Sequence, residues 1–82
     1  MCGMAWKLEN GQLVKEFSFE DFMSAVGFVN HIGLLAEQAN HHPDVLIYSY
    51  NTVRIMLVTH AKKRVTEKDY SLAKQIDALY VK

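Results

Sequence analysis

Asn10-Gly11 is the feature that most constrains how the start of this chain folds, because both residues tolerate the positive φ angles of a type I′ turn. The segments on either side, residues 5–9 and 12–17, are predicted to pair as two strands. A two-residue loop would place Leu8 opposite Leu13. The buried face of this hairpin is then expected to consist of Trp6, Leu8, Leu13 and Phe17.

A helix is predicted next, over residues 19–38. Ser18 is expected to cap its N-terminus, with Asp21 completing a capping box. Phe17 and Phe22 are expected to pack against each other across that cap. Apolar or small residues recur along the segment at helical spacing: Phe22, Ala25, Val26, Val29, Ile32, Gly33 and Ala36.

A second hairpin and a second helix are predicted after Pro43, since the residue before a proline is disfavoured in a helix. β-Branched and aromatic residues predict strands over residues 45–50 and 52–60. Thr66 is expected to cap the last helix, with Asp69 as its capping-box partner. The apolar side of that helix is predicted to contain Tyr70, Leu72, Ala73, Ile76, Leu79 and Tyr80.

This order of elements predicts an α+β fold, ββαββα, in which two helices pack on one face of a four-stranded antiparallel sheet. The 82 residues are expected to form a single domain, residues 1–82, with an ordered core because half of them are hydrophobic. A domain of this size gains burial from association, and a sheet edge can be left for a partner subunit. A homodimer or homotetramer is therefore expected.

Charge and composition exclude several classes of function. The formal net charge is zero, which argues against a nucleic-acid-binding protein. The one basic run, Lys62-Lys63-Arg64, is expected to be a solvated loop, with contact to an anion or a substrate carboxylate as the alternative. No stretch is long and apolar enough to span a membrane, and the single cysteine, Cys2, excludes an internal disulfide. A cytoplasmic location is expected.

Histidine is concentrated in one part of the chain: His41-His42-Pro43 is followed by His60, one hairpin later. Imidazole titrates near neutral pH, so it can donate or accept a proton there. Two imidazoles on opposite sides of a bound substrate could serve as general acid and general base. His31 lies in the predicted first helix, apart from this group, and is expected to be structural.

The spacing of these histidines resembles the signature of the pterin-4a-carbinolamine dehydratase family. That signature has an acidic residue, three spacers, His-His-Pro, an aromatic residue, a further histidine and then an aspartate. The residues that match it are Glu37, His41, His42, Pro43, Tyr50, His60 and Asp69, and the resemblance covers roughly residues 6–80. Two positions depart from the usual pattern: Arg64 stands where many members carry glycine, and Val45 where an aromatic residue is frequent.

The resemblance implies a hydro-lyase that dehydrates 4a-hydroxytetrahydrobiopterin to the quinonoid dihydropterin and so recycles the pterin cofactor. The implied catalytic residues are His41, His42 and His60, with His41 and His60 as the acid–base pair and the exact division of roles left open. The residues implied to contact the pterin are Asn40, His41, His42, Val58, Thr59, His60 and Ala61. The residues implied to support the histidines are Glu37, Pro43 and Asp69. The pterin is the implied small-molecule partner, and no metal or diffusible cofactor is implied.

Other interpretations stand beside this one. Helix-end histidines such as His41 and His42 can bind terminal carbonyl groups, and Asp69 can act only as a cap. Three imidazoles, with His60, could instead hold zinc. A third class is a non-catalytic interaction module, because animal relatives act as dimerisation cofactors of a homeodomain transcription factor.

Overall fold

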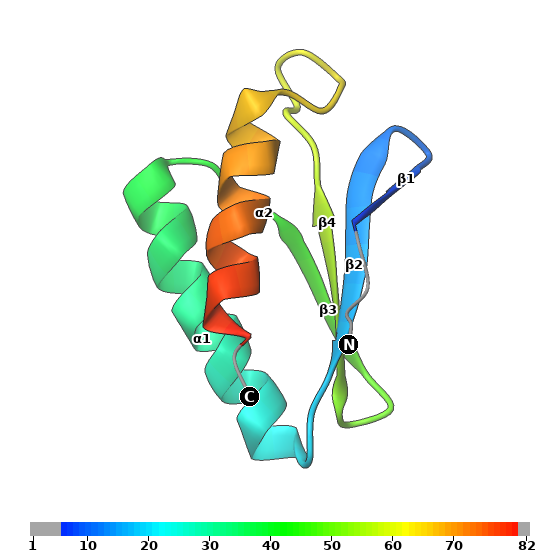
Figure 1. Ribbon diagram of the computed structural model, residues 1–82, viewed down its shortest axis with the longest axis vertical. Coiled ribbons are helices and arrows are strands. Elements are labelled where there is room, and N and C mark those ends of the chain that lie inside the picture. Colours follow the sequence, from blue (N-terminus) through cyan, green and yellow to red (C-terminus); the bar gives the residue numbers. More distant parts are fainter. Residues whose placement is uncertain (1–5, 81–82) are drawn as a thin grey trace.

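The computed structural model describes residues 6–80; the predictions for Cys2 and Ala5 lie outside them. The described chain contains, in order, β1 (Lys7–Glu9), β2 (Gln12–Ser18), α1 (Phe22–Ala39), β3 (Asp44–Tyr48), β4 (Thr52–Leu57) and α2 (Glu67–Leu79). The strands form one antiparallel sheet in the order β1-β2-β4-β3, and Figure 1 shows both helices on the same face of it. The predicted α+β fold and its ββαββα order are confirmed.

The first hairpin has the predicted turn and register. Asn10 and Gly11 have φ angles of 51° and 78°, and Leu8 pairs with Leu13. The prediction that Leu8 is buried is wrong, because 64% of its surface is exposed. β1 is an edge strand of three residues, and it is too short and too far across the sheet for the helices to cover it.

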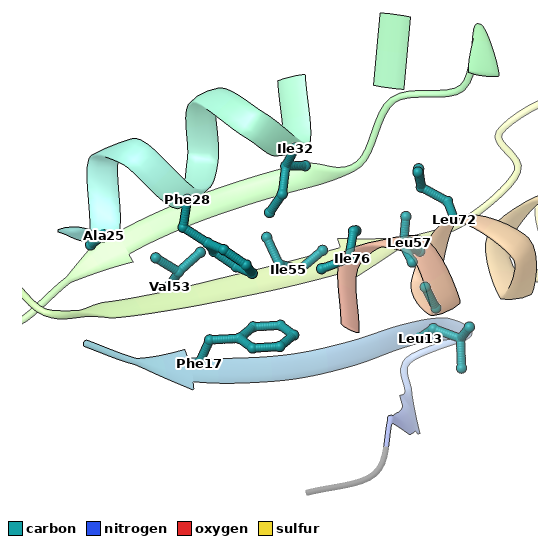
Figure 2. Close-up of a cluster of buried hydrophobic side chains, with 11 residues drawn as sticks. Leu13, Phe17, Ala25, Phe28, Ile32, Val53, Ile55, Leu57, Leu72 and Ile76 are labelled. Carbon is teal, nitrogen blue, oxygen red and sulfur yellow. The ribbon is translucent and has the colours of Figure 1, made fainter. Parts of the chain in front are cut away.

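The core lies between the sheet and the two helices, as Figure 2 shows. The alternation of β2 and β4 directs one side of each strand toward the helices. Phe17 of β2 occupies the centre, and its ring lies 5.0 Å from that of Phe28 and 4.9 Å from that of Tyr80. The buried hydrophobic cluster comprises Leu13, Phe17, Ala25, Phe28, Ile32, Val53, Ile55, Leu57, Leu72, Ala73 and Ile76.

The first helix begins at Phe22, three residues later than predicted, and its N-cap is Asp21 in place of Ser18. The Asp21 carboxylate accepts a hydrogen bond from the Ser24 N–H at 2.8 Å. Ser18 is instead the last residue of β2, and after it the Phe19 N–H donates to the Asn51 carbonyl at 2.8 Å. Phe22 is half exposed, and because Ser18 is not the cap, Phe17 and Phe22 do not flank the N-cap as predicted.

The second helix has the predicted capping box, in which Thr66 and Asp69 satisfy each other's backbone N–H groups. Its buried face comprises Asp69, Leu72, Ala73 and Ile76. Tyr70 was predicted on that face, but it is 52% exposed. The strand before it, β4, ends at Leu57 and not at His60, so strand alternation does not extend to Val58, Thr59 and His60.

Candidate functional site

Asp69 lies at the centre of the candidate site. It is in the first turn of α2 and none of its surface is exposed. Its Oδ1 lies 2.6 Å from Nε2 of His41. Its Oδ2 accepts hydrogen bonds from the Thr59 hydroxyl at 2.8 Å and from the Thr66 N–H at 2.9 Å. A buried carboxylate is thus bonded to one imidazole, one hydroxyl and one backbone amide.

These contacts determine the charge of Asp69. Burial opposes ionisation and would alone raise the pKa of this carboxyl. Hydrogen bonds from His41, the Thr66 N–H and the Thr59 hydroxyl favour the carboxylate, and together they hold the pKa below its ordinary value. Asp69 is therefore ionised at neutral pH. An ionised carboxylate can only accept, so the Nε2 atom of His41 carries the hydrogen in this contact.

The end of α1 brings His41 to this carboxylate. Asn40 is the C-cap, with a φ of 52° in the left-handed region that asparagine adopts more easily than most residues. Its N–H donates to the Ala36 and Glu37 carbonyls, and the His41 N–H donates to the Ala36 carbonyl at 3.1 Å. This cap reverses the chain, and the largely buried His41 side chain meets α2. A cap is thus an observed structural role for Asn40.

A chain of hydroxyl groups supports Asp69 from the other side. Thr59 is 7% exposed, and its Oγ1 lies 2.7 Å from that of Thr66. Because the single hydroxyl hydrogen of Thr59 is used on Asp69, Thr66 must be the donor in the contact between the two threonines. Sequence reasoning predicted the capping role of Thr66 but not the hydrogen bonds that connect Thr66, Thr59 and Asp69.

His42 has a different environment. Its Nε2 lies 2.7 Å from Oε2 of Glu37, one turn back along α1, and both side chains are largely exposed. Pro43 follows, partly buried, immediately before β3. His41 and His42 are therefore bonded to different carboxylates, a buried one for His41 and an exposed one for His42.

His60 lies in the loop between β4 and α2. The residue before it, Thr59, donates to Asp69, the carboxylate that is bonded directly to His41, so the start of this loop is anchored on the same carboxylate. His60 is exposed, and its carbonyl accepts a hydrogen bond from the Lys63 N–H at 3.2 Å. Val58 is partly buried and Ala61 is exposed on either side. Tyr50 is in the β3–β4 turn, at the opposite end of the molecule in Figure 1.

Two pockets border this group. One, of about 340 Å³, is lined by His41 together with Ala39, Ser71, Leu72 and Gln75. The other, of about 360 Å³, is lined by Thr59, Ala61, Lys62, Arg64 and Thr66. Glu67 and Lys68 line both, so the pockets are adjacent across the start of α2. Within residues 6–80, no group of three or more His, Cys, Asp or Glu side chains is placed to hold a metal ion.

Residues 3–79 match the family model described as pterin 4 alpha carbinolamine dehydratase. The chain belongs to this family. The family resemblance in the sequence is thereby confirmed.

Curated relatives agree. A putative pterin-4-alpha-carbinolamine dehydratase of Chloroflexus aurantiacus is 47% identical over 74 residues, which cover 90% of this chain and 78% of the relative. One of Metallosphaera sedula is 46% identical, with 90% of this chain and 76% of the relative covered. The family assignment therefore rests on most of the length of both proteins.

Two solved structures share the fold of this pterin carbinolamine dehydratase family member. A transcriptional coactivator/pterin dehydratase from Brucella melitensis has a TM-score of 0.85 and 35% identity, covering 93% of this chain and 82% of that one. A pterin dehydratase-like protein identified as a RuBisCO assembly factor in the alpha-carboxysome has a TM-score of 0.79 and 22% identity. The second covers 94% of this chain and 90% of its own, and supports the fold alone.

The catalytic, binding and supporting roles assigned to individual residues of this family member stay predictions. The geometry brings together His41, Thr59 and Asp69 and pairs His42 with Glu37. It also adds Thr66 and the pocket residues of α2, which had no assigned role in the site. No helix in the described residues is long and apolar enough to cross a membrane.

Proposed function

We propose that this protein dehydrates a 4a-hydroxytetrahydropterin, with 4a-hydroxytetrahydrobiopterin as the expected substrate, using histidine general acid–base catalysis. In this reaction the bond between C4a and the hydroxyl oxygen breaks, and the hydroxyl leaves as water after it gains a proton. The neighbouring ring N5 loses its proton, and a double bond forms between C4a and N5. One proton is supplied and one is removed, so the enzyme needs one acid and one base and ends in its starting charge state.

The hydrogen bond between His41 and Asp69 is the observation that best supports this proposal. A carboxylate that accepts from one ring nitrogen fixes the tautomer and the orientation of the imidazole. The other nitrogen, Nδ1, is then the atom available for proton transfer. The negative charge of Asp69 also stabilises the imidazolium that forms when Nδ1 takes a proton.

The site also suits the size of the substrate. Pockets that bind small molecules are commonly about 300–1,000 Å³. The pocket beside His41, about 340 Å³, is large enough for a bicyclic pterin ring. We assign His41 and His60 as the acid–base pair and His42 to pterin binding, because the largely buried His41 is fixed by Asp69 while His42 is held only by the exposed Glu37.

The test is the dehydration rate of a 4a-hydroxytetrahydropterin, followed by absorbance in a stopped-flow instrument. His41→Ala and His60→Ala are each expected to lower the rate by roughly 100- to 10,000-fold, the usual contribution of a positioned acid or base. His31→Ala is the matched control, since His31 is an exposed imidazole within α1 that has no place in the family signature formed by His41, His42 and His60. Native-like rates in both site variants would refute the proposed catalysis.

The proposal also covers the location, assembly and cofactor needs of the protein. We infer a cytoplasmic protein that acts as a homodimer or homotetramer on a small-molecule pterin and needs no metal or diffusible cofactor. Nucleic acid is not an expected partner.

An interaction role is the second candidate, and the likeness to a protein described as a transcriptional coactivator/pterin dehydratase favours it. The two candidates differ in what His60→Ala does. If the protein is an interaction module, the native protein shows no dehydration and the His60→Ala variant still binds the partner. If it is an enzyme, the His60→Ala variant loses dehydration activity and keeps its fold.

A further inference from the structure

The loop between β4 and α2 contains three consecutive cations, Lys62, Lys63 and Arg64. Two cations on the sheet are neutralised: Lys15 pairs with Asp77 at 2.7 Å, and Arg54 pairs with Glu9 and Glu16. Within residues 6–80 the three loop cations have no ion-pair partner. A protein with zero net charge therefore has a concentrated, uncompensated positive charge at this place.

The loop has a defined shape. Its two ends are joined by an isolated β-bridge. The Thr59 N–H donates to the Arg64 carbonyl at 3.0 Å, and the Arg64 N–H donates to the Thr59 carbonyl at 3.4 Å. Inside it, the Lys62 N–H donates to the Thr59 carbonyl at 3.0 Å. Lys63 has a φ of 55°, a left-handed conformation in which glycine or asparagine is more usual. The positive side chains are thus attached to a closed turn whose first residue, Thr59, is anchored on Asp69.

The pocket of about 360 Å³ lies against this turn. Its charged lining residues are three cations, Lys62, Arg64 and Lys68, and one acid, Glu67. The lining therefore has an excess of positive charge. Two of its other residues, Thr59 and Thr66, belong to the hydroxyl chain that supports Asp69, and the pocket adjoins the one that contains His41.

We propose that this pocket binds an acidic substituent, a phosphate or a carboxylate, carried by the pterin that is dehydrated at His41 and His60. The inference rests on the proposed function and adds a substrate class to it, namely pterins with an anionic side chain. The cationic side chains would meet the anion while the ring lies beside His41 in the adjacent pocket. Arg64 would contribute a two-pronged donor that matches both phosphate and carboxylate oxygens.

The test compares neopterin with its monophosphate ester as ligands of the native protein, by isothermal titration calorimetry. The ester is expected to bind about tenfold more tightly at low ionic strength, since several exposed charge contacts each add a small factor. That preference should fall to about twofold in roughly 0.5 M salt, where exposed charges are screened. The double variant Lys62→Ala, Arg64→Ala should lose the preference at low salt.

Lys7→Ala is the matched control, because it removes one exposed cation of β1 that does not line the pocket. It should keep the tenfold preference, and thermal unfolding should show that all variants are folded. Equal binding of the two pterins by native protein, or a preference that the double variant retains, would overturn this inference alone. Failure of both pterins to bind would overturn the proposed function as well.

Inorganic phosphate separates a substrate subsite from a simple anion site. It should compete weakly with the phosphate ester and leave the binding of neopterin unchanged. If inorganic phosphate binds as tightly as the ester, the pocket recognises free phosphate and the inference is wrong.

Discussion

Asp69 shows how one residue connects the stability of the fold with the chemistry of the site. An ionised carboxylate without exposed surface is unfavourable unless hydrogen bonds replace its water. Three donors do so here: the ring of His41, the hydroxyl of Thr59 and the backbone of Thr66. The structural and functional interpretations of Asp69 are therefore not alternatives, since the carboxylate that caps α2 is also the one that holds the imidazole.

The lowered pKa of Asp69 predicts a specific dependence of stability on pH. Burial raises the pKa, but the hydrogen bonds outweigh it, so the folded state binds this proton less readily than the unfolded chain, whose aspartates titrate near about pH 3.9. The stabilisation is fully present above that value and is lost as the pH falls through the folded pKa. Asp69→Asn is expected to be less stable at neutral pH and to lose less stability on acidification than the native protein.

Urea denaturation over a series of pH values from about 7 to about 3 measures this difference. Thr59→Val serves as an intermediate case, because it removes one hydrogen bond to the carboxylate and leaves the charge. Its stability should fall less steeply with acidification than that of the native protein. An identical acid dependence in native protein and Asp69→Asn would show that this carboxyl does not contribute.

At the scale of elements, the spacing of apolar residues and the turn-forming residues predicted most of the strands and helices that the structure shows. The two-residue repeat of β2 and β4 identified the strand residues that face the helices, because alternate residues of a strand point to opposite faces. The start of α1 was predicted too early because Ser18 and Asp21 are both acceptable caps. The choice between them depends on a tertiary bond from Phe19 to Asn51, which sequence periodicity cannot reveal.

Gly33 offers a test of the energetics of α1. It lies on an exposed side of the helix, and a Cβ added there would meet no atom within 4 Å. Glycine in a helix interior costs about 0.5–1 kcal/mol relative to alanine, because its unfolded backbone is freer. Gly33→Ala is expected to raise the free energy of unfolding by about that amount. Urea denaturation with the same slope as the native protein would measure it.

Gly11→Ala is the opposite case, and should lower stability because Gly11 has a φ of 78° in the hairpin turn. Both substitutions add one methyl group, so a difference in sign isolates the effect of backbone conformation. A loss of stability in Gly33→Ala would contradict the expected gain from a lower backbone entropy of the unfolded chain.

At the scale of the whole molecule, the site assembles where three connections meet. Figure 1 shows the end of α1, the loop after β4 and the start of α2 at the same end of the molecule. The motif predicted which residues take part, because it fixes their identity and spacing. It could not predict that the Thr59 hydroxyl binds Asp69, since that contact depends on where β4 ends and on how α2 packs.

The edges of the sheet differ in a way that bears on association. β1 is three residues long and carries the charged residues Lys7 and Glu9. β3 is five residues long, pairs only with β4 among the described strands, and exposes the apolar side chains of Val45, Leu46 and Tyr48. Unpaired backbone beside apolar side chains favours addition of another strand. We therefore expect the dimer contact at β3.

Leu46→Lys tests this expectation. Leu46 is 48% exposed on the face of the sheet away from the helices, opposite Arg54 in the β3–β4 register. A lysine there would have to be desolvated in a β3 contact, so the dimer should dissociate at least about tenfold more readily. Sedimentation velocity over a concentration series measures the shift. Leu8→Lys makes the same exchange at an exposed leucine of the opposite edge and should leave the assembly unchanged. If Leu8→Lys dissociates the dimer and Leu46→Lys does not, the contact lies at β1. A monomeric native protein would refute the expected dimer contact.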